Sequence, residues 1–126
     1  MIFDTDVLIS ASRGNESAAR TIDAVSDRAL SIVSLMEFIQ GARSKLEARQ
    51  FQQSLRNLHF RILPLSDPIG ATAAAIIEQY SLTHGIQVTD ALIAATAIDS
   101  GETLCTGNTK HFRPIPALSR VEFRPR

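Results

Sequence analysis

The stretch Ile2-Phe3-Asp4-Thr5-Asp6-Val7-Leu8-Ile9 places two aspartates within an apolar run at the beginning of the chain. This run predicts a short buried strand over residues 1–8, with Asp4 and Asp6 released into a turn at its carboxyl end. A carboxylate that directly follows a buried strand would be partly desolvated, which is costly without a partner. Asp4 is therefore the first candidate functional residue, whereas Asp6 could also be a helix cap.

Strand-like segments and helical patterns alternate along the rest of the chain. Strands are predicted over residues 30–33, 61–65, 102–106 and 121–123. Helices are predicted over residues 15–25, 34–41, 46–58, 66–82 and 89–98, the second of them opened by a capping box from Ser34 to Glu37. This alternation predicts an α/β fold, a three-layer sandwich in which helices flank a central parallel β-sheet. The length of 126 residues suits a single domain over residues 1–126.

The composition excludes several classes of protein. With 44% hydrophobic and 21% charged residues, the chain is expected to bury a core rather than to be disordered. The single cysteine, Cys105, excludes an internal disulfide framework and a cysteine-based zinc site. No apolar run approaches the roughly 20 residues of a membrane helix, and the beginning of the chain lacks a secretory signal pattern. We therefore expect a cytoplasmic protein with no membrane partner.

Charge is segregated along the chain although the net charge is zero. Residues 43–61 contain five basic and one acidic side chain, and residues 106–126 repeat these numbers. Residues 62–105 contain five acidic side chains and no Lys or Arg. Such a distribution suits an acidic metal site inside a basic surround that attracts a polyanion, but ordinary solvated helix faces explain it equally well.

Polar side chains follow several strand ends in the predicted topology. Ligands of parallel sheets bind beyond the carboxyl ends of the strands. Asp4 and Asp6 follow the first predicted strand, and Glu37 follows the second. Asn108 follows the strand that ends at Thr106. We therefore expect these side chains to meet at one edge of the sheet.

Asp90 is expected to reach the same edge from a helix. The helix that begins at Thr89 leads through the tight Ser100-Gly101 turn into a strand, so helix and strand run antiparallel and the helix start returns to the carboxyl edge. Carboxylates collected there would repel one another unless a cation lay among them, and Mg²⁺, with Mn²⁺ as a substitute, is the natural occupant. Such a metal activates water for phosphodiester hydrolysis. As structural alternatives, Glu37 could serve only the capping box and Asp90 only the helix dipole.

Four segments resemble one protein family, the PIN-domain ribonucleases and in particular the VapC-type toxins. They are Phe3-Asp4-Thr5-Asp6-Val7-Leu8-Ile9, Ser34-Leu35-Met36-Glu37-Phe38, Thr89-Asp90-Ala91-Leu92-Ile93-Ala94-Ala95-Thr96-Ala97 and Thr106-Gly107-Asn108-Thr109-Lys110-His111-Phe112. The resemblance implies a PIN-like sandwich, magnesium-dependent endonucleolytic cleavage of RNA, a cognate VapB-like antitoxin and a homodimer. By the same resemblance, Asp4, Glu37 and Asp90 match the catalytic, metal-binding acids of the family.

The chain departs from the family pattern at Asn108, where many members carry a fourth acidic residue. An amide can orient a metal-bound water or a phosphate but brings no charge, so the number of metal ions stays open. Asp6 could supply part of the missing charge. Thr5 and Thr106 are expected to hydrogen-bond the carboxylates.

Basic residues near the predicted site are candidates for guiding RNA, because carboxylates alone would repel a polyanion. These candidates are Arg43, Lys45, Arg49, Lys110 and Arg113. His111 and Lys110, next to the Asn108 turn, could reach phosphate, but we expect both to be solvated loop residues. A helix of the antitoxin is expected to dock on apolar side chains of the early helices, namely Val7, Leu8, Ile9, Leu35, Phe38 and Ile39, and the helices over residues 71–82 and 92–98 could pair two copies.

Two other functions remain open at this point. A noncatalytic PIN-like module would use the same fold to bind RNA or a protein without cleaving RNA. A haloacid-dehalogenase-like phosphatase would use Asp4 as nucleophile and Asp6 as acid/base, but it needs a later acidic pair that the Thr106-Gly107-Asn108 turn does not supply.

Overall fold

A five-stranded, fully parallel sheet with strand order β3-β2-β1-β4-β5 forms the centre of the computed structural model, which describes residues 1–125. The strands are β1 (Ile2–Phe3), β2 (Ala29–Ser31), β3 (Arg61–Leu63), β4 (Leu104–Thr106) and β5 (Arg120–Glu122). The chain winds from β1 outward to β3 and then returns to place β4 on the other side of β1. The strand order therefore reverses between β1 and β4, and a sheet of this kind binds its ligand at the carboxyl ends of that strand pair.

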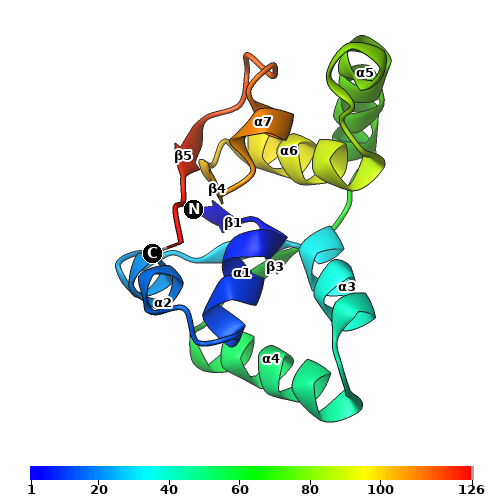
Figure 1. Cartoon of the computed structure of the whole chain (residues 1–126). Coiled ribbons are helices and arrows are strands. Elements are labelled where there is room, and N and C mark those ends of the chain that lie inside the picture. Colours follow the sequence, from blue (N-terminus) through cyan, green and yellow to red (C-terminus); the bar gives the residue numbers. More distant parts are fainter. Residues whose placement is uncertain (126) are drawn as a thin grey trace.

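Helices cover both faces of the sheet, as the alternation of the sequence predicts (Figure 1). Helices α1 (Thr5–Ser12), α2 (Glu16–Asp23) and α4 (Lys45–Asn57) lie on one face, and α5 (Asp67–His84), α6 (Val88–Ser100) and α7 (Thr109–Phe112) lie on the other. Helix α3 (Ile32–Gly41) contributes side chains to both apolar cores. The three-layer parallel α/β prediction is confirmed.

Neighbouring residues of β1, β2 and β4 point into opposite cores, because side chains alternate along a strand. Ile2 belongs to the core under α5 and α6, whereas Phe3 belongs to the core under α1, α2 and α4. Leu104 and Cys105 repeat this alternation on β4. The inner strands are thus covered on both faces.

The predicted first strand is too long, because the chain leaves the sheet after Phe3 and enters α1 at Thr5. Asp4 is the N-cap of α1, with an extended backbone and a carboxylate that accepts a hydrogen bond from the Thr5 N–H. Val7 and Leu8 are buried, but in a helix. A continuous apolar run cannot distinguish a buried strand from a buried helix, and the cap at Asp4 decides between them.

The predicted capping box from Ser34 to Glu37 is also wrong. The helix begins two residues earlier, at Ile32, and Ser31 is its N-cap, with the Ser31 hydroxyl accepting from the Val33 N–H. Glu37 consequently lies beyond the first turn of α3. Its carboxylate is not used in capping and is available to the site.

The starts of α2 and α5 agree with the sequence signals. Asn15 caps α2, and Ser66 caps α5, which has a proline in its first turn. The short helix α7 differs from the expectation, because the sequence indicates a turn and a solvated loop there. Within residues 1–125, no helix is both long enough and apolar enough to cross a membrane.

Candidate active site

Asp4 lies at the point where the strand order reverses, between the end of β1 and the end of β4. Its side chain is buried, with 6% of the residue exposed. Oδ1 accepts a hydrogen bond from the Thr5 N–H at 2.8 Å, and Oδ2 accepts one from the Thr106 hydroxyl at 2.8 Å. Burial and the nearby charge of Asp6 raise the pKa of Asp4 to about 7, although the hydrogen bonds from Thr106 and Thr5 lower it.

Asp6 lies beside Asp4 in the first turn of α1, and both of its oxygens accept backbone hydrogen bonds. Oδ1 accepts from the Val7 N–H at 2.8 Å, and Oδ2 accepts from the Gly107 N–H at 2.9 Å. Burial raises the pKa of Asp6, and these hydrogen bonds oppose the increase. Gly107 permits the close approach, because a Cβ atom at this position would lie 2.7 Å from Asp6 Oδ2.

Glu37 reaches the site from α3 and is connected to Asp4 through Thr5. The Thr5 hydroxyl donates to Glu37 Oε1 at 2.7 Å, while the Thr5 N–H donates to Asp4. Thr106, which is fully buried, makes the corresponding contact from β4. The structure therefore places Thr5 and Thr106 against the carboxylates, as expected.

Asp90 lies in the first turn of α6, and its charge raises the pKa of both Asp4 and Asp6. The expected return of this helix start to the carboxyl edge is therefore observed. His111 is the partner of Asp90: its Nδ1 lies 2.9 Å from Asp90 Oδ2 and 2.9 Å from the Asn108 side-chain amide. The interpretation of His111 as a solvated loop residue is wrong, since it belongs to α7 and contacts an acid of the site. The sequence around His111 gives no signal for this contact, which depends on the short helix α7.

The basic candidates lie in two groups. Arg43 pairs with Glu47 at 3.8 Å, while Lys45 and Arg49 are exposed on the first turns of α4. The second group consists of Lys110 and Arg113, which are exposed on and just after α7, next to His111.

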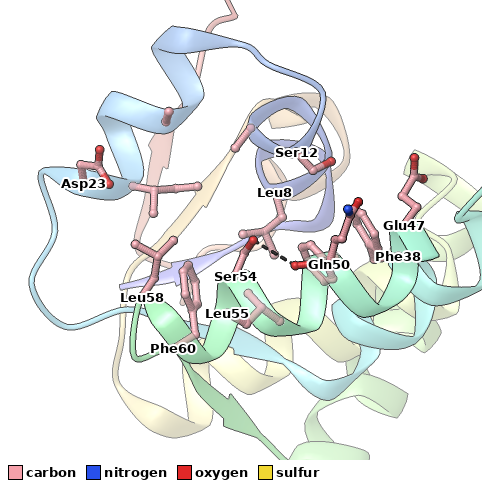
Figure 2. Close-up of a pocket in the computed structure, with 14 residues that line it drawn as sticks. Leu8, Ser12, Asp23, Phe38, Glu47, Gln50, Ser54, Leu55, Leu58 and Phe60 are labelled. Carbon is pink, nitrogen blue, oxygen red and sulfur yellow. Dashed lines mark hydrogen bonds between the residues drawn. The ribbon is translucent and has the colours of Figure 1, made fainter. Parts of the chain in front are cut away.

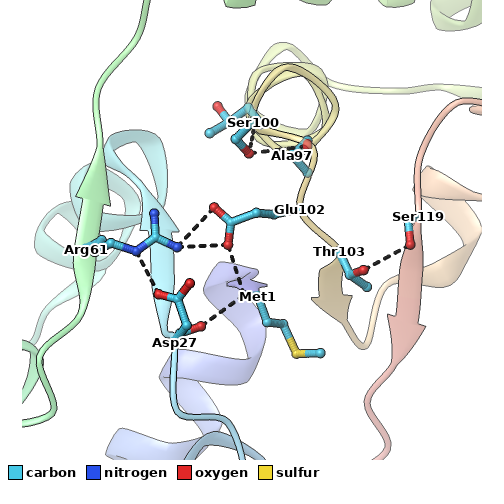
Figure 3. Close-up of polar contacts among 9 residues, drawn as sticks. Met1, Asp27, Arg61, Ala97, Ser100, Glu102, Thr103 and Ser119 are labelled. Atoms are coloured by element: carbon cyan, nitrogen blue, oxygen red, sulfur yellow. Dashed lines mark hydrogen bonds and ion pairs between the residues drawn. The ribbon is translucent and has the colours of Figure 1, made fainter.

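At the opposite edge of the sheet, the carboxylates are paired with a guanidinium. There the Arg61 guanidinium bonds Asp27 at 2.8 Å and Glu102 at 2.9 Å (Figure 3). Asp4 is the most buried acid, yet within the part of the chain that the structure describes it has no ion-pair partner. The negative field around it also extends to Cys105, whose pKa is raised to about 11 by burial and by the charges of Asp6 and Asp4.

The donor set fits a hard divalent cation. Carboxylate oxygens of Asp4, Glu37 and Asp90 lie at one sheet edge with neutral hydrogen-bond donors between them, and hard cations prefer oxygen ligands. The carboxylates do not form a closed cage: among residues 1–125, no three His, Cys, Asp or Glu side chains are grouped as a metal site. Thr5 and Thr106 instead separate them, each donating to a carboxylate oxygen.

A separate groove of about 440 Å³ lies between α4 and the helices α1 and α2 (Figure 2). Its floor is mainly apolar, with Leu8, Phe38 and Leu55 among its lining residues, and Asp23 and Glu47 add negative charge. Leu8 and Phe38 were among the expected docking residues. The other four expected residues, Val7, Ile9, Leu35 and Ile39, do not line this groove.

Fold and site together define a parallel α/β domain whose acidic centre lies where the strand order reverses. The chain belongs to the PIN domain family, whose model matches residues 1–117. PIN domains are generally nucleases and typically use divalent metal ions. Family membership replaces the haloacid-dehalogenase-like alternative.

Several solved structures share this fold. A toxin-antitoxin complex from Klebsiella pneumoniae is 28% identical, with a TM-score of 0.83 and coverage of 99% of this chain and 98% of that chain. VapBC2 from Rickettsia felis, bound to a DNA fragment from its promoter, is 26% identical, with a TM-score of 0.78 and coverage of 98% and 100%. FitAcB from Neisseria gonorrhoeae is 27% identical, with a TM-score of 0.71 and coverage of 96% of each chain. No curated protein sequence matches the chain.

Proposed function

We propose that this chain, as a single domain over residues 1–126, is a metal-dependent endoribonuclease and the toxin of a VapBC-type toxin-antitoxin pair that acts in the cytoplasm. The observation that carries the proposal is Asp4, a buried carboxylate at the ligand-binding edge of a PIN domain with two further aspartates near it and no ion-pair partner among the described residues. Burying a charge without compensation is costly, so such an arrangement points to an external cation.

Asp4, Glu37 and Asp90 would hold this cation, Mg²⁺ or Mn²⁺. When bound, it supplies the Lewis acidity that hydrolysis of a phosphodiester by water requires. The hydrogen bonds from Thr5 to Asp4 and Glu37 fix the direction of both carboxylates before substrate arrives. Asn108 lies beside them with an amide that can orient a water molecule or a phosphate oxygen. No side chain has to act as a nucleophile.

A cleavage assay on total cellular RNA tests this proposal. The purified full chain should cut RNA in the presence of Mg²⁺ or Mn²⁺ and should stop cutting when EDTA is added, and end mapping identifies the cleavage sites. Asp90→Asn, prepared in parallel, controls for a contaminating nuclease. If the wild type binds RNA but never cleaves it under these conditions, the noncatalytic module is the correct function.

The groove on α1, α2 and α4 is the proposed docking site of the antitoxin. The similar structures from Klebsiella pneumoniae and Rickettsia felis were solved as toxin-antitoxin assemblies, which supports a protein partner here. An amphipathic helix fits an apolar groove of this kind. Asp23 at the groove has no ion-pair partner among the described residues and favours a partner helix with Lys or Arg beside its apolar face.

A homodimer is also part of the proposal. Leu82 at the end of α5 is 99% exposed and Val88 at the start of α6 is 63% exposed, so this helix pair leaves apolar side chains uncovered. A second copy of the chain would cover them.

The basic residues next to α3 are proposed to attract RNA toward the acidic edge. Replacing Arg43, Lys45 and Arg49 together by Ser should weaken RNA binding several-fold at low salt and flatten its salt dependence, because fewer counterions are released from the RNA. Binding to a labelled RNA between about 50 and 200 mM salt measures both effects. Mn²⁺ affinity should stay unchanged. An unaltered salt slope would show that these side chains are only a solvated helix face.

A further inference from the structure

One short segment, residues 106–111, contacts every aspartate of the site. Each contact is made by a different chemical group: a hydroxyl, a backbone amide and an imidazole. The imidazole is the only one of the three that adjusts its role by moving a proton between two ring atoms. The pairs are Thr106–Asp4 at 2.8 Å, Gly107–Asp6 at 2.9 Å and His111–Asp90 at 2.9 Å.

The two neighbours of His111 Nδ1 place conflicting demands on that atom. Asp90 Oδ2 is an acceptor, so it requires a hydrogen on Nδ1, whereas the Asn108 NH₂ group requires a lone pair there. A hydrogen bond to a charged group contributes about 1.5–3 kcal/mol, and a neutral one about 1 kcal/mol. The hydrogen therefore belongs on Nδ1 and is donated to Asp90. The amide of Asn108 then turns its oxygen, rather than its nitrogen, toward the ring.

This proton position limits what Asp90 can bind. Oδ2 accepts the His111 N–H, whereas Oδ1 has no hydrogen-bond partner among the described residues and is the better placed of the two oxygens for a cation. The side of Asp90 that faces α7 thus presents an N–H donor and an amide where a second cation would need a carboxylate.

We infer that His111 is a positioning residue that fixes one oxygen of Asp90, and that the site consequently holds a single divalent cation. The inference rests on the proposed function. Three carboxylates carry enough charge to hold one such cation. A second cation beside α7 would meet the His111 N–H and its like-signed partial charge.

Counting bound Mn²⁺ tests the inference without any cleavage measurement. Titrating the purified full chain while following free Mn²⁺ by EPR should give one bound ion per chain. His111→Asp places a carboxylate beside Asp90 and should raise the number to two. His111→Leu should keep one ion but weaken its binding roughly 10-fold or more, as expected when the partner of a metal ligand is lost. His111→Gln retains an N–H donor and should recover most of the affinity.

The outcomes separate the inference from the function on which it rests. Two ions per wild-type chain, together with RNA cleavage, would overturn the inference and leave the nuclease intact. Unchanged Mn²⁺ affinity in His111→Leu would overturn the positioning role. No bound Mn²⁺ at all would overturn both. His84→Leu is the matched control, because this exposed histidine at the end of α5 contacts Thr83 and Tyr80 rather than an acid.

Discussion

Replacing Asp4 by Asn is expected to reduce RNA cleavage by orders of magnitude and, at the same time, to stabilise the metal-free fold. Activity should fall because a neutral amide cannot help to hold the cation. The fold should nevertheless accept the change: the Asn oxygen can accept from the Thr5 N–H, and the Asn NH₂ group can donate to the Thr106 hydroxyl. A loss of activity combined with a gain of stability distinguishes a functional residue from a structural one.

The stabilisation should depend on pH. The pKa of Asp4 is raised from 3.8 to about 7 by burial and by Asp6. Below pH 4 the Asp4 carboxyl is protonated in both the folded and the unfolded chain, so its ionisation does not lower the free energy of unfolding. Between pH 4 and 7 the unfolded chain loses this proton first, and the free energy of unfolding falls as the pH rises. Above pH 7 the charged Asp4 lowers the free energy of unfolding by its full amount, about 4 kcal/mol at roughly 1.4 kcal/mol per pKa unit.

Chemical denaturation with EDTA at pH 4, 6 and 8 measures this effect. Wild type and Asp4→Asn should be similarly stable at pH 4, and the variant should be clearly more stable at pH 8. Asp99→Asn is the control, because Asp99 is exposed near the end of α6 and is expected to change neither cleavage nor stability. If Asp4→Asn were no more stable than the wild type at pH 8, the Asp4 carboxylate would not destabilise the metal-free fold.

The second large effect is expected in the groove. Ala19, an exposed residue of α2, lines the groove, so Ala19→Arg should place a long charged side chain where the antitoxin helix is proposed to lie. Loss of a central apolar contact costs about 2 kcal/mol or more, which corresponds to roughly a 30-fold weaker complex. Cleavage of RNA should continue, because Ala19 contacts none of the carboxylates.

Co-expression with the product of the neighbouring reading frame measures the groove effect. This product should copurify with the wild type and suppress its cleavage, whereas Ala19→Arg should be captured poorly and stay active. Ala117→Arg adds the same charge at an exposed position between α7 and β5, outside the groove and outside the proposed homodimer surface, and should behave like the wild type. Equal suppression of both variants would place the antitoxin on another surface.

The sequence predicts the site better than it predicts the local structure around it. The sequence predicts Asp4 and Asp90 at the same edge of the sheet. The alternating pattern indicates a parallel sheet, and the direction of the chain then determines which helix and strand ends meet. The start of α3 could not be placed, because Ser31 and Ser34 are both acceptable caps and only the end of β2 chooses between them. The contact of His111 with Asp90 spans 21 positions and depends on α7, whose four residues are too few for a periodic signal.

Because β1 pairs with β4, the site can form only after β4 has been synthesised. Ile2 pairs with Leu104, and the Asp4 carboxylate accepts its second hydrogen bond from Thr106, 102 positions later. Contacts so distant in sequence form only after the intervening loop has been closed. A nascent chain emerging from the ribosome therefore has no assembled centre until almost all of the domain has been translated. The strand order thus delays any activity of the centre until the chain is nearly complete.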